Sequence, residues 1–301
     1  MTKLVVWYGQ LTTLSRLRVR GVAVLAGAVL WVTAFLVVPS VVMAALAFAG
    51  RTAYGEISWQ FTLENFRRLL GFGILGWSPD YVLILARSVW MALLTTVLVL
   101  ALSYPLAFYV ATRTARMRYV LLALVVIPSC TNLVIRTYAW MLILGHQMPF
   151  ARLAQAVGLI PGDSALYPGV LAIYVGMVNS FLPLAVLPLY ASAERVDWSL
   201  VEAAQDLYGS KVRVFLHGVV PQTLPGLTAA VILTFIPAMG AFVVPDLLGG
   251  AKYMLVGNLI QQQFGTSRDL PFGAAVSLAL LVVTLVGLFL FRRPGREMDL
   301  T

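Results

Sequence analysis

Six long apolar segments separated by shorter polar stretches dominate the pattern of this chain. A membrane-spanning helix needs about 20 mostly apolar residues, since each residue adds about 1.5 Å along the axis. The segments of that length are 21–49, 88–112, 119–144, 169–191, 226–246 and 271–291. The third is interrupted by Arg136, and Pro128 and Asn132 lie close by. The pattern predicts an all-α membrane protein with six transmembrane helices.

The first apolar segment is too long for a cleavable signal. Residues 21–50 are 30 positions without a charge, whereas the apolar region of a secretory signal has about 7–15 residues. We therefore predict an uncleaved first membrane helix, although Ala47-Phe48-Ala49 is similar to a signal-peptidase site.

The composition indicates a bilayer rather than water as the solvent. Hydrophobic residues make up 60% of the 301 positions and charged residues 11%, with a mean hydropathy of +0.90; soluble domains carry about 25% charged residues. The net charge of +9 does not indicate nucleic-acid binding, because the basic residues lie at the ends of apolar segments and form no continuous patch. Cys130 is the one cysteine, so no internal disulfide can form.

The lysines and arginines predict which side of the membrane each loop faces, because cytoplasmic loops carry an excess of them. A cytoplasmic N-terminus places 13 of the 21 inside. These are Lys3, Arg16, Arg18, Arg20, Arg113, Arg116, Arg118, Arg195, Lys211, Arg213, Arg292, Arg293 and Arg296. We therefore expect both termini, and the loop between the fourth and fifth segments, to be cytoplasmic.

The outer segments are then residues 50–87, 145–168 and 247–270. The first contains SWQFTLENFRRLL, in which Phe61, Phe66, Leu69 and Leu70 are spaced for one helical face. This spacing predicts an amphipathic helix lying at the membrane interface.

The polar loop after the fourth segment, residues 192–217, predicts a short exposed helix. Ser199 can cap it, with Glu202 completing a capping box, and Gly209 is placed to end it. A basic turn, residues 211–217, precedes Pro221 and Pro225, which we expect to redirect the chain. The residues expected to meet a partner are Glu202, Ala203, Ala204, Asp206, Leu207, Tyr208 and Gly209, with Ala203 and Ala204 permitting close approach. A solvated helix without a partner is the alternative.

This loop resembles the motif of ATP-binding-cassette (ABC) importer permeases. Glu202-Ala203-Ala204 is followed by the hydrophobic–proline pair Val220-Pro221, 18 and 19 residues after the glutamate. Two positions depart from the motif. Tyr208 stands where a glycine is expected, with Gly209 one place late, and Gly218 stands where an aliphatic residue is expected.

The resemblance covers residues from about 85 to about 290. ARSVWMALLTTVLVLALSYPLAFYVA (86–111) looks like the start of the permease core. Three further segments are similar to the spermidine/putrescine branch: IPSCTNLVIRTYAWMLILG (127–145), SFLPLAVLPLYASAERVDWSLVEAAQDL (180–207) and GAFVVPDLLGGAKYMLVGNLIQQQF (240–264). Permeases for iron, thiamine and other solutes, including anions, share much of this layout and stay open as alternatives.

The resemblance implies an importer-permease fold with a cytoplasmic coupling helix. The implied parts are residues 1–84 (N-terminal tail, first transmembrane helix and outer loop), 85–291 (permease core, with a coupling loop at about 192–225) and 292–301 (cytoplasmic tail). The chain would be a multi-pass subunit of the bacterial inner membrane. It would pair with a second permease of different sequence in a heterodimer, and a periplasmic binding protein would deliver the solute.

The resemblance also implies that the motor is a separate cytoplasmic ATPase, present in two copies, each gripping one coupling helix. This chain has no G-x-x-x-x-G-K-[ST] phosphate loop. ATP and magnesium would therefore be bound by the partner, and we expect a transport subunit without a cofactor of its own, not an enzyme.

A polyamine is a polycation, which carboxylates and aromatic faces can bind. Asp246 is the acidic residue within the apolar segments, at the outer end of the fifth, so it is a candidate for solute contact; an interfacial aspartate capping a broken helix is the alternative. Further candidates for the pathway are Tyr138, Trp140, Tyr174, Asn132 and Asn179, each of which could instead pack helices together.

Arg136 would repel a polycation, so we expect a structural role for it. It could pair with Asp246 or cap carbonyls freed around Pro128, whereas an anion transporter would use it as a ligand. Two other classes of protein fit less well. An ion-coupled secondary transporter would need more charged groups within the spans, and an intramembrane enzyme would need a nucleophile–base pair or a metal cluster, neither of which the sequence contains.

Overall fold

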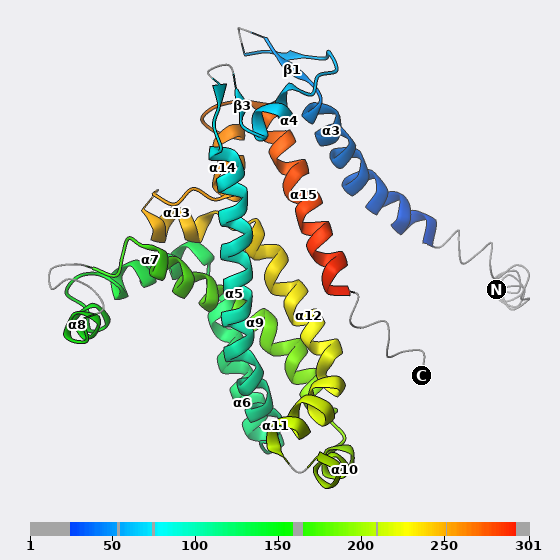
Figure 1. Ribbon diagram of the computed structural model, residues 1–301, viewed down its shortest axis with the longest axis vertical. Coiled ribbons are helices and arrows are strands. Elements are labelled where there is room, and N and C mark those ends of the chain that lie inside the picture. The colour runs from blue at the N-terminus through cyan, green and yellow to red at the C-terminus, as the bar shows by residue number, and fades with distance from the viewer. Residues whose placement is uncertain are drawn as a thin grey trace, which may run out of the picture.

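The computed structural model is an elongated bundle of helices (Figure 1). It describes residues 25–52, 55–73, 76–158, 165–208, 210–250 and 252–292. Within these ranges, five helices are long and apolar enough to cross a membrane, and a bent pair of helices makes a sixth if it is counted as one span. The predicted helical membrane fold is confirmed. The N-terminal tail and the residues after Arg292 lie outside the described residues.

Three long helices form the centre of the bundle: α5 (Asp80–Ala111), α9 (Val170–Ala193) and α12 (Val220–Met239). Small and branched residues fill the space between them, including Val99, Ala185 and Ala230. Helices can approach closely in a membrane where one of them carries glycine. A β-carbon on Gly226 of α12 would lie only 2.5 Å from the Pro188 carbonyl oxygen of α9. This position therefore accepts no side chain without moving the helices apart.

Among its described residues, Leu25–Ala47, the first span meets the rest of the molecule only near its C-terminal end, which we call the outer end after the predicted orientation. It contains η2 (Thr33–Val37) and α3 (Val38–Ala47), and Ala47 packs against Ala274 and Ala275 of α15 (Leu270–Arg292). Further along, the span leans away from the bundle (Figure 1), and its apolar side chains are exposed. A side chain in that position is stable in a bilayer or against another chain, but not in water.

The third predicted span is broken. α6 (Ala115–Val126) and η3 (Ile127–Cys130) are followed by α7 (Leu133–Ile143), which turns away by 97°. Pro128 removes a backbone donor at the break. Asn132 then starts the new helix, because its side-chain oxygen accepts a hydrogen bond of 2.8 Å from the Val134 N–H. The expectation of one helix over residues 119–144 is therefore wrong.

The fifth predicted span is wrong at both ends. The helix begins at Lys211 and runs without interruption through α11 (Lys211–Val214), η4 (Phe215–Val219) and α12. The prolines do not redirect it. Pro221 directly follows the π-helical turn η4, and the shifted hydrogen bonds of such a turn accommodate a proline within the longer helix. At the other end, the chain breaks at Gly240 and forms the separate helix α13 (Val243–Gly249).

α13 lies beside α9, about halfway along the bundle in Figure 1. Gly176 of α9 makes this contact possible, because a β-carbon there would collide with Leu248 and lie 2.8 Å from the Val244 Cγ1 atom. Two other short helices complete this side of the molecule: α8 (Pro149–Ala156) and α14 (Val256–Phe264).

The outer end carries two short antiparallel hairpins and the helix α4 (Glu64–Leu69). β1 (Gly50–Arg51) pairs with β2 (Ile57–Ser58), and β3 (Phe72–Gly73) pairs with β4 (Gly76–Trp77). The expected amphipathic helix is shorter than predicted and does not have one apolar face. Leu69 is buried and Phe66 packs against Phe48, whereas Phe61 and Leu70 are exposed.

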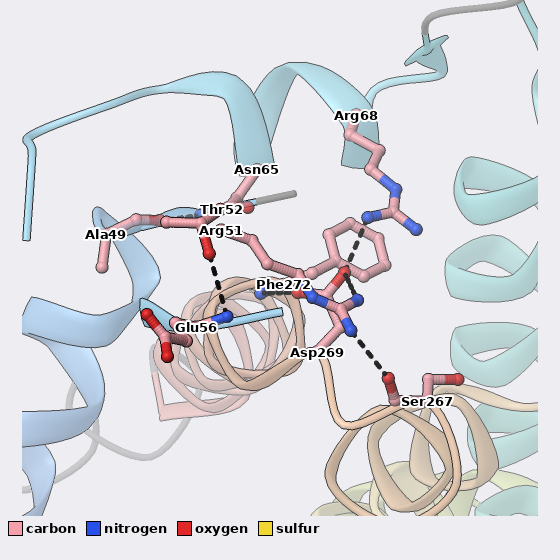
Figure 2. A network of polar contacts seen from close by, with 9 residues as sticks. All are labelled: Ala49, Arg51, Thr52, Glu56, Asn65, Arg68, Ser267, Asp269 and Phe272. Carbon is pink, nitrogen blue, oxygen red and sulfur yellow. Dashed lines mark hydrogen bonds and ion pairs between the residues drawn. The ribbon is translucent and has the colours of Figure 1, made fainter. Parts of the chain in front are cut away.

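Polar contacts, together with the buried Leu69, hold α4 in place (Figure 2). Asp269, only 4% exposed, accepts a hydrogen bond of 2.8 Å from Arg68 and lies 3.4 Å from Arg51. Its second oxygen accepts from the Phe272 N–H at 3.3 Å, so Asp269 also caps α15. Burial alone would lower the pKa of Arg68, but the hydrogen bonds and charges of Asp269 and Tyr81 outweigh it and raise that pKa.

Asn65 ties the same helix to the end of α3. Its amide nitrogen donates to the carbonyl oxygens of Ala47 at 3.0 Å and Ala49 at 2.8 Å. Without Asn65, these two buried carbonyls at the end of α3 would have no hydrogen-bond partner. The first span, α4 and α15 are thus joined at the outer end.

Candidate coupling helix and transport pathway

The predicted coupling helix is present as α10 (Trp198–Tyr208), at the end of the bundle opposite the strands (Figure 1). Asp197, not Ser199, caps it. The Asp197 carboxylate accepts hydrogen bonds from the Ser199 backbone N–H at 2.9 Å and from the Ser199 hydroxyl at 2.7 Å. These bonds favour the charged form and lower the pKa of Asp197. Asp197 therefore fixes the start of α10, and the predicted Ser199–Glu202 capping box is wrong.

A side chain of α12 holds the start of α10 from the other side. The Gln222 side-chain oxygen accepts from the Asp197 N–H at 2.8 Å, and its nitrogen donates to the Gly218 carbonyl at 2.7 Å. The Gln222 side-chain amide thus joins the loop before α10 to η4, the π-helical turn that precedes α12 and is called the π turn below. The loop is further fixed by Glu194, which forms an ion pair with Arg118 at the start of α6.

The inner face of α10 forms part of an apolar cluster that we call the seat. The seat comprises Val196, Val201, Ala204, Val214 and Val219, and Phe108 of α5 packs against it. Ala204 is 7% exposed. A β-carbon built on Gly218 would lie 3.1 Å from that of Ala204, which is tighter than ordinary contact. Gly218 therefore allows α10 to lie directly on the π turn, which gives a physical reason for its departure from the motif.

The outer face of α10 carries charge and one prominent apolar side chain. Glu202, Ala203, Asp206 and Leu207 are all exposed, and Leu207 is 80% exposed. Ala203 and Ala204 do not share a face, because Ala204 points into the seat. This corrects the expectation that both would face a partner. Gly209 and the side chain of Tyr208 lie outside the described residues.

Asp246 lies on α13, not at the end of the fifth span as predicted. Its side chain is exposed, and its backbone N–H donates to the Phe242 carbonyl at 2.9 Å within the first turn. α13 packs against both α7 and α9, about halfway along the bundle. A carboxylate at that depth is costly unless it faces protein or water. The new position therefore strengthens the reason to regard Asp246 as a pathway residue.

Arg136 takes the second of its two expected structural roles. Its guanidinium donates to the Pro128 carbonyl oxygen at 2.8 Å. This bond satisfies a carbonyl at the break between η3 and α7, where the helical ladder is lost. Arg136 thus stabilises the bend.

The remaining pathway candidates fall into two groups. Trp140 and Tyr174 pack against the core formed by Met91, Ile173 and Leu248, so they contribute to helix packing. Tyr138 is half exposed on α7, the helix that packs against α13, and Asn179 is partly exposed on α9. Asn132 caps α7, and it is exposed too. The structure brings α7, α9 and α13 together, but does not gather these side chains into one pocket.

Two sets of residues were missed by reasoning from the sequence. Asp269 with its arginines gave a weak signal, an aspartate directly before an apolar segment, which is typical of a helix cap. Tyr104 and Thr223 gave none, although their hydroxyl oxygens are 2.8 Å apart. They lie 119 positions apart along the chain.

A bundle of membrane helices that presents a seated helix beyond the ends of its spans defines a membrane transport subunit. Residues 103–298 match the family described as binding-protein-dependent transport system inner membrane component, and the chain belongs to that family. It is therefore the permease subunit of an ABC importer, a multi-pass protein of the inner membrane and a transport protein rather than an enzyme. The resemblance to this family is confirmed.

Named relatives match nearly the whole chain. The spermidine/putrescine transport system permease protein PotB of Escherichia coli (strain K12) is 36% identical over 269 residues, which are 89% of this chain and 95% of that protein. PotB of Haemophilus influenzae (strain ATCC 51907) is 34% identical over 269 residues, or 89% of this chain and 92% of that protein.

The fold matches a crystal structure described as a bacterial alginate ABC transporter in complex with an alginate pentasaccharide-bound periplasmic protein. The TM-score is 0.68 at 13% identity, over 93% of this chain and 94% of that chain. At this identity the likeness concerns the fold alone.

Proposed function

We propose that this chain is a permease subunit of a polyamine importer for spermidine and putrescine. The observation that carries the proposal is the 36% identity to a spermidine/putrescine permease over 89% of the chain. Arg136 supports it as well. An anion importer would use this arginine as a ligand, whereas here its Nη1 donates to the Pro128 carbonyl and serves the bend between η3 and α7.

We propose that the outer face of α10 docks on a cytoplasmic ATPase, present in two copies, one of which binds this chain. ATP and magnesium are bound by that partner, and this chain holds no cofactor. Glu202 and Asp206 supply charges, and Leu207 supplies an apolar side chain that a pocket on the ATPase would bury. The cap at Asp197 and the seat at Ala204 support this proposal, because a helix that transmits a displacement must be fixed at its base.

For the transport pathway, we propose that solute passes beside Asp246, with Tyr138 and Asn179 on the neighbouring helices. The carboxylate would attract one ammonium group of a polyamine, and the ring of Tyr138 offers a cation–π face. A second permease, of different sequence, closes the pathway from the other side. A periplasmic binding protein delivers the solute, a proposal that the family's own description supports.

Uptake of radiolabelled putrescine, spermidine and an unrelated cation of similar size tests the proposal. The permease is co-expressed with an ATPase, a second permease and a binding protein from the same organism. We expect saturable, ATP-dependent uptake of one or both polyamines. Co-purification of a nucleotide-hydrolysing subunit checks the docking proposal separately. Uptake of the unrelated solute alone would overturn the assignment of polyamines.

A further inference from the structure

Two aromatic side chains on α5 connect the seat of α10 to the centre of the bundle. Tyr104 and Phe108 are one helical turn apart, and their ring centroids are separated by 5.1 Å. Phe108 packs against the seat. Tyr104 packs against the core shared by α5, α9 and α12, the one that contains Val99 and Ala230. The Tyr104–Phe108 pair therefore links the seat to the central core.

Tyr104 also makes a polar contact with α12. Its hydroxyl lies 2.8 Å from the Thr223 hydroxyl, and Thr223 is fully buried. Thr223 also lies 3.1 Å from the Val220 carbonyl oxygen, to which it donates within its own helix. A threonine hydroxyl has one hydrogen to give. Either hydroxyl could donate in this contact, and when Thr223 donates to the Val220 carbonyl, Tyr104 is the donor.

This hydrogen bond lies next to the π turn on which α10 rests. The edge of the Tyr104 ring meets Phe215 of that turn, with centroids 5.8 Å apart. In the described part of the chain, this hydrogen bond joins a side chain of α5 to a side chain of α12. A displacement of α10 would reach α12 through Gly218 and the π turn, and would reach α5 through Phe108.

We propose that Tyr104 is a positioning residue that ties α5 to α12, so that the two helices move as one unit when α10 is displaced. The inference rests on the proposed function, because it assumes a partner that displaces α10. Without the tie, α12 follows α10 directly, while α5 follows through the contact of Phe108 with the seat and the apolar packing of Val99 near Ala230, which lets the helices slide. The pathway would then open less fully for each ATP hydrolysed.

Tyr104→Phe is the sharpest test, because it keeps the ring and removes only the donor. Thr223 keeps its bond to the Val220 carbonyl, so no buried group loses its last partner and folding is little affected. We expect solute uptake per ATP hydrolysed to fall about fivefold, the equilibrium factor expected for one lost hydrogen bond. ATP hydrolysis itself, normalised to the amount of assembled complex, should stay close to wild type.

Companion variants separate the tie from a general defect. Thr223→Val should give the same loss, and adding it to Tyr104→Phe should cause no further loss, because both remove one bond. Thr223→Ser keeps a hydroxyl and should restore a normal ratio. Tyr109→Phe makes the same change on the same helix at a ring that is 47% exposed, so it should have no effect. A wild-type ratio in Tyr104→Phe would overturn the tie.

A second measurement needs neither solute nor ATPase. Spin labels are placed at Leu102→Cys on α5 and Leu216→Cys on the π turn, both exposed positions, in a Cys130→Ser background. We expect a narrow distance distribution that broadens when Tyr104→Phe is added. Unchanged width would overturn the tie whatever the transport result. If wild type imports no polyamine, the proposed substrate fails while these distances still test the tie.

Discussion

Ala204 and Gly218 lie so close that the β-carbon of one occupies the space that a side chain on the other would need. A β-carbon built on Gly218 would stand 3.1 Å from that of Ala204. Ala204 belongs to α10, and Gly218 belongs to the π turn below α12. The contact therefore fixes how near the coupling helix lies to the span that follows it. It also explains why this chain has a glycine where the family's motif has an aliphatic residue.

Replacing Gly218 by the aliphatic residue of the motif should loosen α10. In Gly218→Leu, the added side chain meets Ala204 and the backbone of Val201, and overpacking of this kind costs about 1–3 kcal/mol. We expect a lower thermal unfolding midpoint of the purified complex and less uptake per ATP. Gly240→Leu is the matched control, because a β-carbon there meets nothing within 4 Å. An unchanged midpoint in Gly218→Leu would show that α10 can move away from the turn without cost.

Asp197 makes the start of α10 sensitive to acid. Its pKa is lowered in the folded protein, so its stabilising effect is complete above the ordinary aspartate pKa of about 3.9 and is lost as pH falls through the lower folded value. At neutral pH the cap is thus fully formed, and Asp197→Ala should speed amide hydrogen exchange in residues 198–202. Asp206→Ala, further along the same helix, should leave that exchange unchanged. Equal exchange in wild type and Asp197→Ala would mean that the cap does not hold α10.

Charge reversal on the outer face of α10 should uncouple transport. Glu202 is exposed, so Glu202→Lys should insert and fold normally. If Glu202 meets the ATPase, we expect uptake to fall about tenfold, which corresponds to ~1.4 kcal/mol of docking free energy. Uptake and ATP hydrolysis in reconstituted vesicles measure the effect. Glu56→Lys, at an exposed site near the opposite end of the molecule, is the control. Normal coupling in Glu202→Lys would refute the docking role.

The hydrophobic pattern predicted the positions of the spans well, except where a break in the backbone ends or turns a helix. Residues 169–191 and 271–291 match α9 and α15 closely. Hydropathy does not reveal that an apolar run changes direction, as at Pro128 and Gly240, because the residues on both sides of such a break remain apolar. Pro221 led to the opposite error, because a change of direction was predicted where the helix continues. A π turn accommodates it within the longer helix, and no sequence pattern announces that turn.

The coupling helix was predictable because its signals are local, whereas its orientation was not. Helix formers and a motif of fixed spacing locate α10 within two residues of its start. Which alanine points inward depends on Gly218, and that contact exists only after the chain has folded back. The same applies to Arg68 and Asp269, which lie 201 positions apart. The sequence shows both charged residues, but it does not show that they form a pair.

Asp246→Asn should weaken the import of polyamines if the carboxylate meets the solute. The amide keeps the shape and removes the charge, so the KM for spermidine should rise about fivefold, as expected for the loss of one partly solvated ion pair of roughly 1 kcal/mol. The rate at saturating solute should change less. Glu56→Gln neutralises an exposed acid elsewhere and should leave KM unchanged. Normal kinetics in Asp246→Asn would assign this residue to the structure of α13.

Asp269 should be the residue whose loss most weakens the outer end. In Asp269→Ala, two arginines lose their partner and α15 loses its cap. Breaking a fully buried pair costs about 3–5 kcal/mol, but Arg51 and Arg68 are 39% and 41% exposed and water can replace the carboxylate in part. We therefore expect a loss of about 1–3 kcal/mol, seen as a lower unfolding midpoint. Arg67→Ala should shift the midpoint little, because Arg67 is exposed and only stacks on Phe72. If both variants unfolded alike, Asp269 and its arginines would contribute nothing measurable to holding the outer end together.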